Sequence, residues 1–223
     1  MTRGFLCHPV LGALGVEHGF GTRAARFPSR VALPRQVHGT VVATVDSKGE
    51  AHPEEADAIV SGAGEGPVGI VTADCVPILA ASGDASKVVA IHAGWRGLAA
   101  GVVEAGIAAL GPGDAHEIRA VIGPAIGVCC YEVDAPVLGA LRLRFDGGLD
   151  RATFESRPGH ARLDLCELVR TELHALGLAA SKIGAIENAC TRCDDRRFHS
   201  YRRDGAESGR LLHFIEPRSS DQA

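Results

Sequence analysis

The sequence has few aromatic residues and no long apolar run. Aromatic residues make up 4% of the 223 residues, with one Trp and one Met. No stretch approaches the roughly 20 apolar residues of a membrane span. The first 19 residues are interrupted by histidines and glycines before a signal-peptide core forms. We therefore expect a cytoplasmic protein with no membrane partner.

An excess of charge of one sign is also missing. The chain has 23 Lys and Arg against 27 Asp and Glu, a formal net charge of -4. Nucleic-acid-binding domains usually show a clustered excess of basic residues, so we expect no nucleic-acid partner. The seven cysteines are odd in number and lack a regular framework spacing, which favours a reducing compartment over a disulfide scaffold.

Hydrophobic residues make up 46% of the chain, which is enough for an ordinary core, and the length favours one domain over residues 1–223. Short apolar runs predict strands at 40–45, 68–72, 87–91, 118–122 and 211–215. Helical periodicity predicts helices at 98–109 and 165–176, the second between an Asp164 cap and Gly177. The segment 144–163 has no clear period, and we expect an irregular loop with short strands.

The predicted strands do not alternate regularly with helices. The strands that end at Thr72 and Ala81 are too close in sequence to be joined by a crossover helix. This spacing argues against a regular doubly wound parallel sheet. The fold class that we predict is a mixed α/β (α+β) domain, in which mixed sheets are covered by helices.

Three segments place a possible metal ligand at the end of a predicted strand. They are Arg35-Gln36-Val37-His38-Gly39, Thr72-Ala73-Asp74-Cys75-Val76-Pro77 and Ile91-His92-Ala93-Gly94-Trp95-Arg96-Gly97. Two His and one Cys would leave a fourth tetrahedral position open, as in catalytic zinc sites. Spacing alone leaves the alternative open that each of the three is an ordinary core or turn residue.

The strings RQVHG, ADAIVSG, TADCVPIL, AIHAGWRGLAAGVV, IGPAIGVCCYEV, CTRC and FHSYRRDG stand in this order over most of residues 18–216. In order and spacing they resemble the laccase-domain family, also called YfiH/YlmD-like, multicopper polyphenol oxidase or purine nucleoside phosphorylase. The resemblance implies an α/β/α layered sandwich with a surface cleft and a zinc ion held by His38, Cys75 and His92. It also implies phosphorolysis of purine nucleosides, with adenosine deamination and methylthioadenosine cleavage as associated activities.

The resemblance has one gap. Family members carry a longer stretch between the segments seen here as HGFGTR and RQVHG, where this chain has only residues 24–34. We therefore expect a shortened N-terminal contribution to the substrate pocket and carry no role over to Arg23. The resemblance implies purine nucleosides and phosphate as binding partners. We expect the protein to be a monomer or a weak homo-oligomer.

Three further residues are catalytic candidates. Asp74 can orient a metal-bound water or protonate a leaving base, or it can simply form a turn. Arg96 precedes a predicted helix and can hold phosphate, or its stem can cover the sheet edge. Gln36 can hydrogen-bond a purine edge or the backbone.

Cysteine and arginine groups elsewhere have plainer interpretations. The Cys190-x-x-Cys193 pair can be half of a zinc site or a redox pair. Because the sequence has no second such pair and no adjacent thioredoxin-like βαβ pattern, we interpret it as a pair of structural thiols, and we interpret the vicinal Cys129 and Cys130 in the same way. The arginines at positions 202, 203 and 210 can close over a phosphate or form a solvated face.

Other functions remain open. A copper polyphenol oxidase is disfavoured because no two histidines are separated by one residue and Met1 is the only candidate for an axial Met, although an axial oxygen would still permit copper. A metal-free hydrolase would use Cys75 as nucleophile and His92 as base. A non-enzymatic domain, such as one serving cell-wall precursor quality control, is a further alternative.

Overall fold

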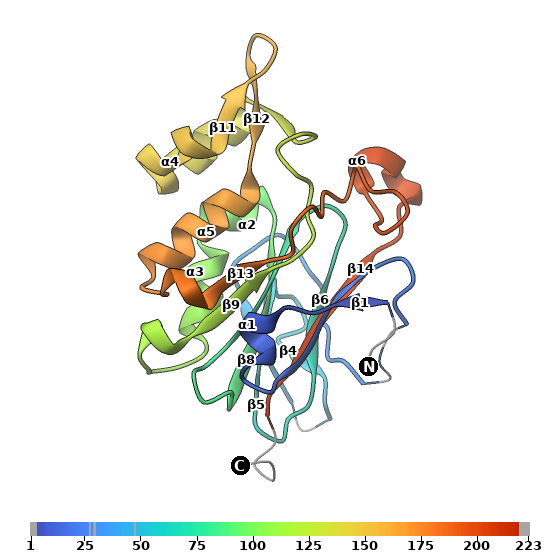
Figure 1. The fold of residues 1–223 in the computed structure, drawn as a ribbon, viewed down its shortest axis with the longest axis vertical. Helices are drawn as coiled ribbons and strands as arrows, with labels where there is room; N and C mark the ends of the chain where they lie inside the picture. The colour runs from blue at the N-terminus through green and yellow to red at the C-terminus, as the bar shows by residue number, and fades with distance from the viewer. Residues whose placement is uncertain (1–3, 27, 29, 47, 219–223) are drawn as a thin grey trace.

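The computed structural model describes residues 4–26, 28, 30–46 and 48–218, and three sheets and a layer of helices form within them (Figure 1). The largest sheet has seven strands in the order β13-β9-β7-β8-β5-β3-β4. Its strands are β3 (Val42–Val45), β4 (Ala51–His52), β5 (Ala58–Gly62), β7 (Val76–Ala81), β8 (Lys87–Ala93), β9 (Arg119–Ile122) and β13 (Ile183–Ala185). The pairs β3/β5 and β9/β13 are parallel and the others antiparallel, which confirms the predicted mixed sheet.

A second sheet of four strands runs in the order β1-β2-β14-β6. It comprises β1 (Phe5–Leu6), β2 (Glu17–Gly21), β6 (Val68–Thr72) and β14 (Leu211–Glu216). A third, three-stranded sheet projects beyond the helices (Figure 1) and comprises β10 (Glu132–Asp134), β11 (Thr153–Glu155) and β12 (His160–Leu163). All five strands predicted from apolar runs are present, with boundaries that differ by at most two residues.

The helices lie mainly on one side of the large sheet (Figure 1). They are α1 (Pro9–Gly12), α2 (Trp95–Ala100), α3 (Val102–Ala108), α4 (Ala135–Ala152), α5 (Leu165–Ala175) and α6 (Tyr201–Asp204), with short 3-10 turns at Ala115–Glu117, Ala180–Lys182 and Gly205–Glu207. Helix α5 begins as predicted, because the Asp164 carboxylate accepts the Glu167 N–H at 3.0 Å.

Two helix predictions need correction. The predicted helix 98–109 is two helices, because Gly101 adopts a left-handed φ of 97° that ends α2 and begins α3. The segment 144–163 contains the short strands that were predicted, β11 and β12, but its first part is the second half of α4, which bends at Asp146 (φ 29°, ψ -119°), and not an irregular loop. Two glycines after the bend obscured the helical period in the sequence.

The large sheet is buried on both faces by two separate cores. In β7, Val76, Ile78 and Ala80 pack into the core beneath the helices. The alternate residues Leu79 and Ala81 pack into the second core, against the four-stranded sheet. The large sheet therefore lies between the helix layer and the four-stranded sheet.

Candidate functional site

Strand pairing brings the three predicted ligands to one edge of the large sheet. Strands β7 and β8 are antiparallel with Val76 opposite Ala93, so Cys75 lies beside the end of β8 that carries His92. His38 approaches from the loop before β3. The ligand atoms of His38, Cys75 and His92 lie within 4.8 Å of one another, and Cys75 Sγ is 4.0 Å from His38 Nε2.

A buried carboxylate holds this group in place. Asp57 is fully buried and accepts a hydrogen bond from His92 Nδ1 at 2.7 Å. It also accepts the backbone N–H groups of Val37, His38 and Gly39 at 3.1, 2.9 and 2.6 Å. These bonds hold His38 at a φ of 63°, a left-handed conformation that a non-glycine residue rarely adopts. Asp57 therefore fixes the His92 tautomer and the His38 backbone together.

The electrostatics of the group favour a thiolate. Burial raises the pKa of Cys75, but hydrogen bonds and charge from His38 and His92 outweigh burial and lower the pKa to about 6. For His92, burial lowers the pKa, but the hydrogen bonds with Asp57 and Cys75 raise it to about 9. Burial likewise raises the pKa of Asp57, and its hydrogen bonds with His92, Gly39 and His38 hold it below the usual range.

This donor set fits a metal ion. Two imidazoles and one thiolate are zinc ligands, and three protein ligands leave one position for water or substrate. His92 uses Nδ1 to bond Asp57 and so keeps Nε2 for an ion, the carboxylate–histidine arrangement typical of metal sites. Gly94 leaves room for this approach, because a Cβ there would lie 3.0 Å from both Cys75 Sγ and His38 Cδ2.

The three ligands line a cleft of about 600 Å³. The residues that line it are Pro34, Arg35, Gln36, His38, Val71, Thr72, Ala73, Asp74, Cys75, His92, Ile126, Tyr131, Leu165, Tyr201, Arg202 and Arg210. Five of the six residues predicted from the sequence are thus brought together. Arg96 is not among the lining residues; it is exposed, and its guanidinium lies 4.5 Å from the centre of the Trp95 ring.

Asp74 and Gln36 line the cleft but have protein partners. Asp74 accepts hydrogen bonds from Thr191 Oγ1 at 2.6 Å and from the Arg202 N–H at 2.7 Å, one on each carboxylate oxygen. Gln36 makes two hydrogen bonds of 2.8 Å with the backbone of Val71. Both side chains therefore position the cleft walls, and the chemical roles predicted for them stay predictions.

Sequence reasoning missed Asp57 and underrated two tyrosines. Tyr131 follows the vicinal cysteines and Tyr201 belongs to the FHSYRRDG string, but neither was given a role. Burial, then the charge of Cys75, raise the pKa of Tyr131 to about 12, so its hydroxyl stays protonated. Tyr201 is 54% exposed at the cleft. The signal for Asp57 was its place in the ADAIVSG string, where a carboxylate directly precedes the apolar residues of β5.

Two arginines give the cleft positive charge. Arg202 stacks 5.1 Å from the Tyr131 ring centre and donates to the Glu132 carbonyl at 3.1 Å. Arg210 bonds only backbone carbonyls of its own loop. Among the described residues neither guanidinium has a carboxylate partner, whereas Arg35 forms ion pairs with Glu54 and Glu55.

The matching family model is described as multi-copper polyphenol oxidoreductase laccase and covers residues 20–218. The chain belongs to this family. It is 41% identical over 183 residues to a purine nucleoside phosphorylase of Xylella fastidiosa, covering 79% of this chain and 68% of that protein. It is 33% identical over 192 residues to adenosine deaminase RL5 from an unknown prokaryotic organism, covering 82% and 73%.

Solved structures agree with this family assignment. The crystal structure of YlmD from Geobacillus stearothermophilus superposes with a TM-score of 0.85 and 28% identity, covering 98% of each chain. The mixed α+β fold of the laccase family is therefore the fold of this chain. None of the helices in the described ranges is long and apolar enough to cross a membrane.

The family description names copper. Among the described residues, no group of metal-binding side chains contains more than two histidines. These residues contain two groups of three or more metal-binding side chains: the His38–Cys75–His92 group and a group of four cysteines. Met1, the axial candidate considered above, lies outside the described residues.

Proposed function

We propose that the chain is a zinc-dependent purine nucleoside phosphorylase that accepts adenosine, inosine and methylthioadenosine, and that the same cleft deaminates adenosine. The observation that carries the proposal is the convergence of His38, Cys75 and His92 on a cleft that also presents Arg202 and Arg210, whose guanidinium groups have no carboxylate partner among the described residues. The names of the similar proteins, purine nucleoside phosphorylase and adenosine deaminase, support it.

His38, Cys75 and His92 are the residues that would hold the zinc ion. A bound zinc ion supplies Lewis acidity and makes a water molecule at its open position acidic near neutral pH. Asp57 holds the proton on His92 Nδ1, which leaves Nε2 as the ligand atom. This division of protons leaves the Nε2 lone pair available, as a metal ligand requires.

Phosphorolysis breaks the bond between the anomeric carbon of ribose and a purine nitrogen and joins that carbon to a phosphate oxygen. The purine leaves with the bonding electron pair and takes up a proton, in net terms the one that the phosphate loses on forming its bond to carbon. Arg202 and Arg210 provide the positive charge that binds and aligns the phosphate. The exposed Tyr201 ring provides a face on which the purine can stack. Tyr131 lines the cleft and keeps its proton, so its hydroxyl is available to donate a hydrogen bond to the substrate.

The test compares two activities of one protein. Arg202→Met removes a charge-assisted contact worth about 1.5–3 kcal/mol, which predicts a loss of about 10- to 150-fold in phosphorolysis of inosine. Deamination of adenosine without phosphate should keep its rate, because water is then the nucleophile. Both rates are measured at equal zinc occupancy over a range of phosphate concentrations.

Arg96→Met is the matched control, because Arg96 is an exposed arginine outside the cleft lining. It should leave both rates unchanged. A selective loss of phosphorolysis in Arg96→Met would return the phosphate role to Arg96, as the sequence predicted. Absence of phosphorolysis and deamination in the zinc-loaded parent protein would refute the proposed function as a whole.

A metal-free cysteine hydrolase is the second candidate. Cys75, as nucleophile, contacts His92, the base, and His92 is oriented by its hydrogen bond to the Asp57 carboxylate. His38 favours the metal site over this alternative, since a dyad needs no third donor near Cys75 Sγ. Removal of metal by a chelator separates the two. A hydrolase would keep its turnover and expose Cys75 to alkylation, whereas the proposed enzyme loses activity and regains it on addition of zinc. One equivalent of copper with turnover of a phenol would assign polyphenol oxidation instead.

A further inference from the structure

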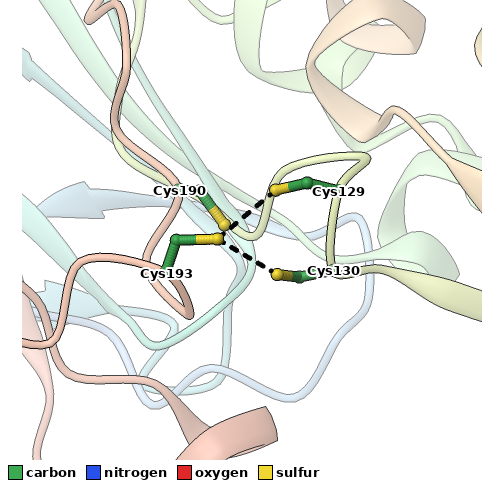
Figure 2. A group of neighbouring side chains, drawn as sticks. All are labelled: Cys129, Cys130, Cys190 and Cys193. Atoms are coloured by element: carbon green, nitrogen blue, oxygen red, sulfur yellow. Dashed lines mark hydrogen bonds between the residues drawn. The ribbon is translucent and has the colours of Figure 1, made fainter.

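Two tight turns bring four cysteines together on the far side of the cleft wall. In one turn, the N–H groups of Cys130 and Tyr131 bond the Gly127 carbonyl at 2.9 and 3.0 Å. In the other, the Asp194 N–H bonds the Cys190 carbonyl at 3.1 Å. A backbone bridge between Ala125 and Cys190 joins the two segments. The sulfur atoms of Cys129, Cys130, Cys190 and Cys193, two from each turn, point toward one another (Figure 2).

The spacing of the sulfur atoms matches a single tetrahedral ion. Cys193 Sγ lies 3.5 Å from Cys129 Sγ and 3.2 Å from Cys130 Sγ, and all four sulfur atoms lie within 4.8 Å of one another. A zinc ion with bonds of about 2.3 Å to sulfur places its ligands about 3.8 Å apart. All seven cysteines are free thiols in the structure.

Two hydrogen-bond donors from outside the cluster face its sulfur atoms. The Gly127 N–H donates to Cys190 Sγ at 3.3 Å, and Arg192 Nη1 donates to Cys130 Sγ at 3.5 Å. Hydrogen bonds of this kind, together with a positive charge, offset the negative charge that four thiolates bring to one ion.

We propose that Cys129, Cys130, Cys190 and Cys193 bind one Zn²⁺ in a closed structural site, separate from the His38–Cys75–His92 group. Four protein ligands leave no position for substrate, so the site is structural and not catalytic. Tetrahedral sulfur sites hold zinc or iron–sulfur centres, and sulfur atoms this close leave room for one ion but not for a cluster with bridging sulfides. On binding, the thiol protons pass to solvent.

The site would crosslink two walls of the cleft. Tyr131, which lines the cleft, follows the ligand Cys130 directly. Thr191, between the ligands of the other turn, donates to the Asp74 carboxylate at 2.6 Å. Asp74 in turn precedes Cys75. A metal crosslink between the turns therefore fixes side chains that reach the catalytic edge of the sheet.

The experiment measures the number of zinc ions per chain in the full-length protein. The protein is purified with a reductant and without an immobilised-metal column, and weakly bound metal is removed before the measurement. We expect two zinc ions per chain in the parent protein and one in Cys190→Ser/Cys193→Ser. His38→Ala/His92→Ala should also retain one, from the four-cysteine site. The matched control, Cys7→Ser, changes a thiol outside both groups and should keep two zinc ions.

Cobalt substitution of the parent protein keeps the proposal testable if the double variants fail to fold. The proposal predicts the intense visible and near-ultraviolet absorption of tetrahedral cobalt bound by four thiolates, in addition to the spectrum of the other site. A parent stoichiometry of one zinc that His38→Ala/His92→Ala abolishes would overturn the proposal. A disulfide among the four cysteines in protein that binds as much zinc as the fully reduced parent would also overturn it. The visible absorption of an iron–sulfur cluster in the protein as purified would do the same.

Discussion

Asp57→Asn is the most informative single change, because Asp57 connects the proposed metal ligand His92 with the loop that carries His38. Each carboxylate oxygen accepts two hydrogen bonds: Oδ1 from His92 Nδ1 and the His38 N–H, Oδ2 from the Val37 and Gly39 N–H groups. An amide has one acceptor oxygen, so its NH₂ group faces two donors in either orientation. Two hydrogen bonds are lost whichever way the amide turns.

The magnitude follows from the charge and burial of these bonds. Hydrogen bonds to a charged group contribute about 1.5–3 kcal/mol each, so losing two predicts a loss of about 3–6 kcal/mol in the free energy of unfolding. Removing a carboxylate that orients a metal-bound histidine typically weakens metal binding by about 10- to 100-fold. We expect both effects in Asp57→Asn, the second measured by competition for zinc with a chelator of known affinity.

Glu172→Gln is the control for a merely structural effect. Glu172 is also a buried carboxylate, but it lies in α5 and bonds Arg144 in α4 at 2.6 Å. This variant should lose stability and keep its zinc affinity. Equal zinc affinity in Asp57→Asn and the parent would refute the assigned role of Asp57, as would an equal loss of affinity in the two variants.

Three further changes test the physical account of the fold. Arg144→Met leaves the buried Glu172 carboxylate without its cation, and we expect a loss of about 3–5 kcal/mol in urea unfolding that Arg144→Met/Glu172→Leu largely restores. Burial lowers the pKa of His213 to about 3, so the unfolded chain binds a proton below about pH 6.5 that the folded chain does not. Stability should therefore fall by about 2 kcal/mol between pH 7.5 and pH 5, and His213→Gln should lose this component of the pH dependence while any acid release of metal stays common to both proteins. Gly94→Ala places a Cβ 3.0 Å from Cys75 Sγ, so zinc affinity should fall while the thermal midpoint changes little; unchanged affinity would show that the site has room to spare.

The sequence was most informative where a pattern was local. The β-branched run at 68–72 and the Asp164 cap of the helix at 165 each act within a few residues, and both are present as predicted. The helical residues 144–152 were missed because their apolar pattern is not confined to that segment. The buried ones, including Phe145 and Leu149, continue a stripe that begins before the segment considered, and the bend at Asp146 hides it.

The site was predicted only in part because its remaining components are nonlocal. His38, Cys75 and His92 were visible because each lies near one end of a predicted strand. Asp57 was not, because three of its four partners are backbone N–H groups that no residue pattern encodes. The four cysteines were treated as two incomplete pairs, since only the folded chain brings the turn at 127–130 to the turn at 190–193.

Asp74 links the two cysteine-containing groups, and this explains why its side chain is fully used by protein partners. Its backbone carbonyl accepts the Ile126 N–H at 3.0 Å, and its carboxylate accepts Thr191 Oγ1 and the Arg202 N–H. One residue therefore receives bonds from the segment before the first cysteine turn, from the second turn and from the arginine that we assign to phosphate. Because Cys75 is the next residue, we expect a change in the position of either turn to shift Cys75, a proposed zinc ligand, through Asp74. The arrangement makes the geometry of the cleft depend on contacts well outside the cleft itself.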